Sequence, residues 1–218
     1  MDKRDVIICS ASALTASTVA VLLYRYFSQR RKNVYETDKL VNEYLIFHFG
    51  KPREVLSYNF GPVDALDFPL RCAEVCIQNA EKDIPSFALD VGCAVGRSTF
   101  ELARHFKHVV GIDYSQAFVD TCTTLKMYGK LHYRVTTEGC LYSEHDALVD
   151  DDISLWLGGY KDSEGNPVTG FDTLKNYLKP HFDLLEAKDM PFFIRETARK
   201  NQWSVAQLSV WRRRKVIN

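Results

Sequence analysis

The residues best placed to do chemistry follow two short apolar runs of the chain. The first run, 87–91, contains Asp90 and leads into Gly92 and Gly96, and the second ends at Asp113. Glycines after a buried strand let the backbone turn sharply and approach a ligand closely. A helix that begins at such a turn presents free N–H groups to the ligand, and a carboxylate after the next strand can accept both hydroxyls of a ribose. The pattern therefore indicates a nucleoside cofactor.

Two nucleoside cofactors compete for a turn of this kind. A nicotinamide dinucleotide favours G-x-G-x-x-G, because the start of the helix meets a pyrophosphate. Here the order is G-x-A-x-G, with Ala94 in the middle. Asp90, just before the turn, would repel a pyrophosphate but suits the ammonium group of a methionine moiety. S-adenosylmethionine is therefore favoured, and an NAD-binding oxidoreductase or a glycine turn without any ligand are the alternatives.

The hydrophobic pattern around these motifs predicts a β-α-β-α frame, which is typical of a parallel sheet with right-handed crossovers. Its expected strands and helices are 87–91, 97–106, 108–112 and 115–128. Helical spacing predicts two further helices, over 34–49 and over 70–80, the second with Pro69 in its first turn. Alternating or apolar runs predict a strand pair over 131–142 that turns at 137–139, and two later strands over 181–186 and 205–211.

The stretch D-V-G-C-A-V-G-R-S-T-F-E-L-A-R, which begins at Asp90, and the later V-G-I-D-Y-S resemble the class I methyltransferases. More narrowly, they resemble the methyltransferase domain of ovothiol biosynthesis, which methylates a ring nitrogen of mercaptohistidine with S-adenosylmethionine. Similar segments extend the resemblance over most of residues 44–213, at 44–50, 68–73, 156–162, 194–200 and 210–213.

The resemblance implies a set of cofactor-binding residues within the two motifs. The methionine part would be cradled by Asp90, Gly92, Ala94 and Gly96, and the ribose would be held by Asp113. The neighbouring Cys93 and Tyr114 belong to the same implied set. The methyl acceptor would be a small molecule, such as a histidine-like or thiol-imidazole-like compound. His48 and Tyr58 are polar groups among aromatics and are candidate general bases, but no residue is assigned as catalytic.

The chain departs from that family in two places. The family's iron-dependent sulfoxide synthase domain is not found, and an apolar segment stands in its place. The family has strands three to five of its seven-stranded fold in the region that corresponds to 146–156. At the usual size of a strand-helix-strand unit, this chain lacks roughly 60–90 residues there. We therefore expect an α/β, Rossmann-like class I methyltransferase fold without strands 3–5. A catalytically inactive, membrane-tethered remnant is the alternative function.

Residues 6–24 contain no charged side chain and predict a membrane helix. Such a helix would be about 28 Å long, close to the hydrocarbon thickness of a bilayer. Basic residues follow it at positions 25, 30, 31 and 32, so the positive-inside rule leaves the rest of the chain in the cytosol. We expect an anchor over 1–32 and a methyltransferase-like domain over 33–218, at the mitochondrial outer membrane or the endoplasmic reticulum. A buried helix of a soluble fold is the alternative.

The composition excludes several classes of protein. Because 28 Lys and Arg balance 28 Asp and Glu, the chain has no long-range attraction to nucleic acid. A hydrophobic content of 46% and a charged content of 26% exclude a disordered tail or a disulfide-dense scaffold. Cys72 and Cys76 share a helix face, but no second Cys/His pair has zinc-site spacing, so no metal is expected. The oligomeric state is left open.

Overall fold

The structure is a computed structural model that describes residues 34–80, 87–149, 155–159, 175–176 and 178–214. The chain divides into two units, 1–34 and 35–218, and the elements below belong to the second unit apart from Val34. The expected anchor over 6–24 lies outside the described residues. Within the described part of the chain, no helix is long and apolar enough to cross a bilayer.

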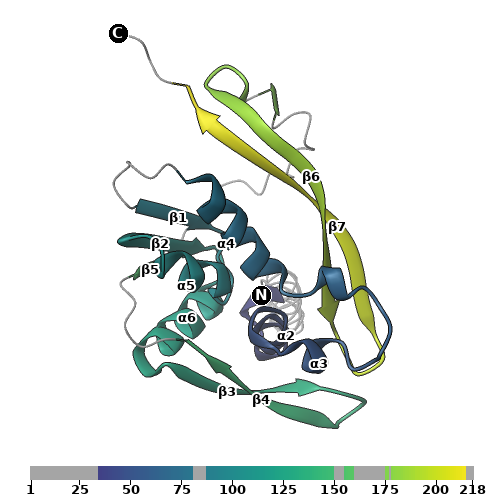
Figure 1. The fold of residues 1–218 in the computed structure, drawn as a ribbon. Coiled ribbons are helices and arrows are strands. Elements are labelled where there is room, and N and C mark those ends of the chain that lie inside the picture. Colours follow the sequence, from purple (N-terminus) through teal and green to yellow (C-terminus); the bar gives the residue numbers. More distant parts are fainter. Residues whose placement is uncertain (1–33, 81–86, 150–154, 160–174, 177, 215–218) are drawn as a thin grey trace, which may run out of the picture. The chain divides into compact units, whose positions relative to one another are not determined.

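Three parallel strands form the sheet that carries the glycine turn (Figure 1). Their order is β1 (Phe87–Val91), β2 (His108–Asp113) and β5 (Leu155–Gly159), with β2 in the middle. Helix α5 (Arg97–Ala103) connects β1 to β2, and α6 (Gln116–Tyr128) follows β2. The predicted β-α-β-α frame is thus confirmed, and the carboxyl ends of β1 and β2 lie side by side because the strands are parallel.

The expectation that the sheet lacks its third strand is wrong. β5 pairs in parallel with β2, from Val109 opposite Leu155 to Asp113 opposite Gly159. A five-residue run that ends in two glycines carries little strand signal by itself, so only the neighbouring strand reveals it. The shortening is expected between 146 and 156, and residues 150–154 of this range lie outside the described residues. The loss of strands four and five stays a prediction.

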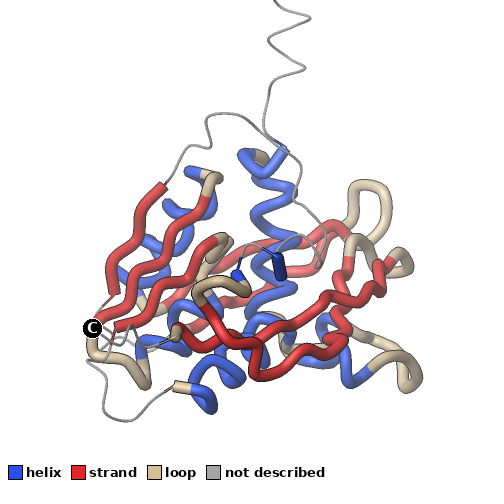
Figure 2. The backbone as a smooth tube through the Cα atoms, turned by 90° about the horizontal axis from the view of Figure 1, so that it is seen from above, coloured by secondary structure: helices blue, strands red, loops and turns tan. Residues whose placement is uncertain are grey.

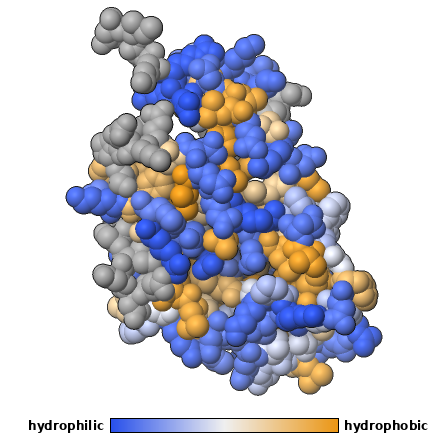
Figure 3. Space-filling model, in the orientation of Figure 1, coloured by the Kyte–Doolittle hydropathy of each residue, from blue (hydrophilic) through white to orange (hydrophobic). Residues whose placement is uncertain are grey.

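β1 is the edge strand of this sheet among the described residues. Its alternate side chains Phe87, Leu89 and Val91 are each more than 60% exposed, whereas Ala88 and Asp90 between them are half-buried. Apolar surface also reaches the face seen in Figure 3 as several patches among hydrophilic side chains. An edge strand with apolar side chains and unpaired backbone groups is a surface prone to association.

Two antiparallel hairpins account for the remaining strands (Figure 2). β3 (Lys130–Thr136) pairs with β4 (Tyr142–Leu148) around a turn near Gly139, as predicted, but the second strand runs to Leu148, beyond the predicted end at 142. β6 (Phe182–Arg195) pairs with β7 (Asn201–Arg213). The expected strands over 181–186 and 205–211 are therefore parts of one much longer hairpin, with a register shift between Leu184 and Glu186.

Helix α2 (Asp38–Phe49) lies at the centre of the packing. It contacts β3, β4, β6 and α6, and its Leu45 and Ile46 are almost fully buried. It follows the short helix η1 (Val34–Glu36), so the predicted helix over 34–49 is split at the N-cap Thr37. The other helices are α3 (Pro52–Val55), η2 (Val63–Ala65) and α4 (Phe68–Asn79), the last with Pro69 in its first turn as predicted.

Candidate functional site

The turn between β1 and α5 is built from three residues with left-handed backbone. φ is +80° at Gly92, +46° at Ala94 and +92° at Gly96. The backbone N–H groups of Gly92 and Cys93 both donate to the carbonyl of Ile112, at 2.8 and 3.1 Å. These bonds fix the turn to the end of β2, so the predicted cofactor-binding residues of the two motifs are brought together at one edge of the sheet.

The two glycines of the turn have different surroundings. A Cβ atom on Gly92 would meet no atom within 4 Å, so this position faces open space. A Cβ atom on Gly96 would lie 2.8 Å from the Cys122 sulfur and 2.9 Å from the Phe100 ring. Gly92 therefore leaves room for a ligand to approach the backbone, whereas Gly96 lets the turn lie close to Cys122 of α6 and to the Phe100 ring.

Asp113 holds the turn in place through both oxygens of its buried carboxylate. Its Oδ2 accepts the backbone N–H of Ala94 and its Oδ1 accepts that of Ser115, each at 2.8 Å. A carboxylate oxygen can accept more than one hydrogen bond, so Asp113 keeps capacity for a ribose hydroxyl. Direct contact with a ribose stays a prediction, as does a cofactor contact by the adjacent, half-exposed Tyr114.

Asp90 comes just before the same turn and accepts a hydrogen bond from Thr99, a residue that the sequence analysis did not single out. The Thr99 hydroxyl donates to Asp90 Oδ2 at 2.6 Å. Burial raises the pKa of Asp90, the hydrogen bond from Thr99 opposes this shift, and the charge of Asp113 adds to it. The available signal was the position of Thr99 in the first turn of α5, where a side chain can face back towards β1.

Helix α2 reaches the beginning of α5 through His48. Its Nδ1 accepts the backbone N–H of Arg97 at 3.3 Å, so it satisfies one of the free donors at the helix N-terminus. Burial, with a smaller effect from the charge of Arg97, lowers the pKa of His48 to about 3. His48 is therefore a neutral acceptor and a weak base. The other candidate base, Tyr58, is exposed and stacks on Phe60.

The buried position of His48 predicts a loss of stability in mild acid. Its pKa falls from 6.5 in the unfolded chain to about 3 in the folded one, so only the unfolded chain gains the proton in this interval. The free energy of unfolding should therefore fall from about pH 6.5 down to pH 3, by at most about 5 kcal/mol. Urea unfolding at a series of pH values measures this fall.

A His48→Asn variant provides the control, because the Asn side-chain oxygen can still accept the Arg97 N–H. Carboxylates also titrate in this range, so the relevant quantity is the difference between the two proteins. The variant should lose less stability on acidification than the parent. Identical pH profiles for the two proteins would contradict the assignment.

The beginning of α6 is closed by residues from the N-terminal side of the domain. Ser115 is the N-cap, and its hydroxyl accepts the N–H of Phe118 at 3.2 Å. Glu36 accepts the N–H groups of Gln116 and Ala117 at 2.9 and 3.0 Å, where a negative charge suits the helix dipole. Nothing in the local sequence pairs Glu36 with a helix some eighty residues later, so this contact could not be predicted.

An aromatic residue completes this side of the site. The Tyr44 ring lies 4.7 Å from that of Phe118, and burial raises the pKa of Tyr44 to about 12, with the neighbouring Tyr35 and Asp113 adding to the shift. Tyr44 is therefore a neutral hydrogen-bonding group near Asp113. The helix η1 and helix α2 thus supply polar and aromatic groups around the carboxyl end of β2.

Of the cysteines that the structure describes, Cys93 and Cys122 are buried, Cys72 is half-buried, and Cys76 and Cys140 are exposed. Cys122 donates to the carbonyl of Ala94 at 3.1 Å, which ties α6 to the glycine turn. Burial raises the pKa of Cys72 to about 11, so this thiol is protonated and unreactive at neutral pH. In the parts of the chain that the structure describes, no three His, Cys, Asp or Glu residues are arranged to hold a metal ion.

The comparison with protein families addresses this same region. Residues 88–143 match the family described as methyltransferase domain. This segment is methyltransferase-like. It contains almost all of β1, together with α5, β2, α6, β3 and every predicted cofactor-binding residue. The match does not address the narrower likeness to the ovothiol domain. No curated protein matches the chain.

Solved structures resemble the chain only loosely. A putative RNA methyltransferase from Pyrococcus horikoshii has 10% identity and a TM-score of 0.42, with 76% of this chain and 92% of that chain covered. A structure described as conversion of a disulfide bond into a thioacetal group during echinomycin biosynthesis has 11% identity and a TM-score of 0.37, covering 66% and 80%. The cyclase SpnF has 14% identity and a TM-score of 0.31, covering 55% and 59%.

Proposed function

We propose that this protein binds S-adenosylmethionine and transfers its methyl group to a small molecule, with a mercaptohistidine-like imidazole nitrogen as the acceptor. The observation that carries the proposal is the open space in front of Gly92, inside the methyltransferase-like segment and beside Asp90 and Asp113. We also propose an anchor over 6–24, with the domain on the cytosolic side.

The residues at the turn fit the cofactor by their chemistry. The half-buried carboxylate of Asp90 suits an ammonium group, and Asp113 retains acceptor capacity for a hydroxyl. When bound, S-adenosylmethionine supplies an activated methyl group on a sulfonium centre. The protein's own contribution is then to hold the acceptor in line with that group and to exclude water. His48 contributes indirectly, because it fixes the N-terminus of α5.

Asp90→Asn tests the proposal by separating binding from stability. The Asn oxygen can still accept the Thr99 hydroxyl, and the variant loses a carboxylate whose ionised form is disfavoured by burial. The free energy of unfolding should therefore stay the same or rise slightly. The affinity for S-adenosylmethionine should fall about tenfold, because a charge-assisted hydrogen bond is lost. Calorimetric titration of the full chain and urea unfolding measure the two effects.

Asp120→Asn is the matched control, since it lies on the exposed side of α6 and its oxygen can still accept the Gln116 side-chain amide. Asp120→Asn should bind S-adenosylmethionine as tightly as the parent. Equal affinities of the parent and Asp90→Asn would contradict the assigned role of Asp90. A parent protein that prefers NADH would instead support an oxidoreductase.

The exposed face of β1 favours a second candidate, an inactive remnant. Leu89 and Val91 are 61% and 62% exposed, which is unusual for the first strand of a parallel sheet. A remnant of this kind would be tethered but would not bind the cofactor. The same titration separates the two functions: saturable binding by a monodisperse protein supports the methyltransferase, and no binding by an aggregating protein supports the remnant.

A further inference from the structure

The beginning of helix α6 is held by acceptors from two different parts of the chain. A helix leaves its first N–H groups without partners inside the helix, and here four of them in a row have an acceptor. The acceptors, at 2.8–3.2 Å, are Asp113 Oδ1 for Ser115, the two oxygens of Glu36 for Gln116 and Ala117, and the Ser115 hydroxyl for Phe118. Asp113 and Glu36 therefore hold this helix end together.

The same hydrogen bonds continue to the glycine turn. The other oxygen of Asp113, Oδ2, accepts the N–H of Ala94 at 2.8 Å. On the opposite side, the Ser115 hydroxyl donates to the carbonyl of Tyr35, the neighbour of Glu36, at 3.0 Å. A continuous set of hydrogen bonds thus runs from η1 through the start of α6 to Asp113 and the turn. A shift at the start of α6 would move the Ser115 N–H that Asp113 accepts.

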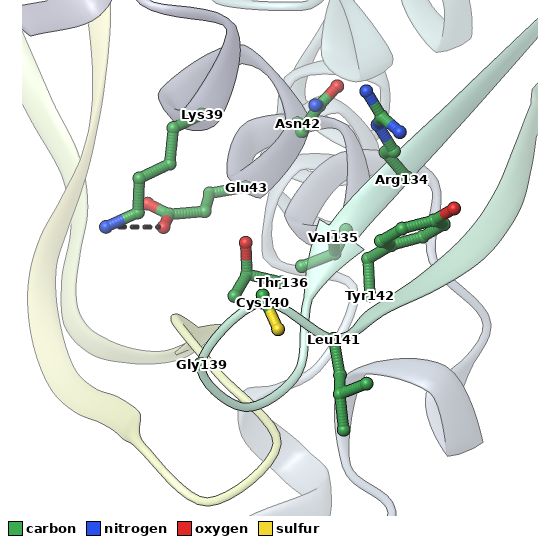
Figure 4. A pocket seen from close by; sticks show the side chains of 10 residues that line it. All are labelled: Lys39, Asn42, Glu43, Arg134, Val135, Thr136, Gly139, Cys140, Leu141 and Tyr142. Atoms are coloured by element: carbon green, nitrogen blue, oxygen red, sulfur yellow. Dashed lines mark ion pairs between the residues drawn. The ribbon is translucent and has the colours of Figure 1, made fainter.

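The carboxylate of Glu36 binds backbone groups rather than a cationic side chain. Glu43 on α2 shows the other arrangement, since it pairs with Lys39 beside the cavity between α2 and the tip of the β3–β4 hairpin, with 3.6 Å between nitrogen and oxygen (Figure 4). Within the described part of the chain, Glu36 forms no ion pair, and its charge lies at the positive end of the α6 dipole. Neutralising Glu36 therefore removes its interaction with α6 and breaks no salt bridge of the described residues.

We propose that Glu36 is a positioning residue of the cofactor site, which holds the start of α6 where Ser115 can orient the carboxylate of Asp113 towards the cofactor. This inference rests on the proposed function, because Glu36 acts through Ser115 and Asp113 and has no reaction of its own. The residues that follow the proposed anchor region thus take part in the cofactor site. By linkage, cofactor binding and the order of the α6 start stabilise each other.

Two variants of the full chain test the role of Glu36 by calorimetric titration with S-adenosylmethionine. Glu36→Ala removes both acceptor oxygens and the charge, so it should weaken binding about tenfold. Glu36→Gln keeps one acceptor oxygen and should weaken binding only about threefold. Both variants should speed the amide hydrogen exchange of Gln116 and Ala117, in the same order. In the parent, S-adenosylmethionine should slow the exchange of these two amides, which a helix cap without influence on the cofactor site would not show.

Asp38→Asn is the matched control, because Asp38 is exposed in the first turn of α2 and the substitution removes the same charge from the same part of the chain. It should change neither the affinity nor the amide exchange. If the parent binds S-adenosylmethionine and Glu36→Ala binds it as tightly, the positioning role is overturned and the proposed function stands. Equal weakening by Asp38→Asn, or unchanged exchange of Gln116 and Ala117 in Glu36→Ala, would also overturn the positioning role. A parent without saturable binding would overturn both the role and the proposed function.

Discussion

Gly96→Ala should lower the free energy of unfolding by about 2–5 kcal/mol, because strain at a left-handed residue and overpacking each cost about 1–3 kcal/mol. The backbone at Gly96 has a φ of +92°, which side chains rarely adopt. The added Cβ atom would also lie 2.8 Å from the Cys122 sulfur and 2.9 Å from the Phe100 ring. Because these contacts hold the turn against Cys122 and Phe100, the turn that carries the cofactor residues should shift as well. Urea unfolding measures the stability.

Gly92→Ala is the matched control for the packing part of this effect. Its φ of +80° imposes similar backbone strain, but its Cβ atom would meet nothing within 4 Å. It should therefore cost only about 1–2 kcal/mol, yet weaken the binding of S-adenosylmethionine by filling the open approach. Adding Cys122→Ala to Gly96→Ala should recover part of the lost stability. Equal destabilisation by the two glycine variants would show that packing at Gly96 has no effect.

Asp113→Ala should be comparably destabilising and should abolish cofactor binding. The carboxylate is buried and accepts the backbone N–H groups of Ala94 and Ser115. Without it, two N–H donors lose their partner, at a cost of about 1–3 kcal/mol each. We expect a loss of about 2–5 kcal/mol in the free energy of unfolding. Urea unfolding and calorimetric titration with S-adenosylmethionine measure the two effects.

Asp113→Asn distinguishes the structural role from the binding role. Its oxygen can satisfy one of the two N–H donors, whereas its NH₂ group faces the other donor, so about half of the stability should return. Its binding should remain weak, because the amide lacks the negative charge. A fully stable Asp113→Ala variant would contradict the structural role, and a stable variant that binds normally would contradict both roles.

The strands and helices that carry the glycine turn could be predicted from local sequence signals. The apolar run that precedes Gly92 forms the strand Phe87–Val91, and the helix Gln116–Tyr128 begins after its N-cap Ser115. These elements depend on signals within a few residues of one another: hydrophobic runs, glycines that accept positive φ, and side chains that cap helices. The grouping of Asp90 with Asp113 followed, because adjacent parallel strands place their carboxyl ends together.

Contacts between segments far apart in the sequence could not be predicted in this way. Leu155–Gly159 becomes a strand because β2 supplies hydrogen-bond partners along its whole length. His48 and Glu36 reach the beginnings of α5 and α6 from another part of the chain. The cavity between α2 and the β3–β4 hairpin likewise joins residues that are far apart in the sequence. Such contacts leave no periodic signal, because each is selected by the packing of the whole domain rather than by neighbouring residues.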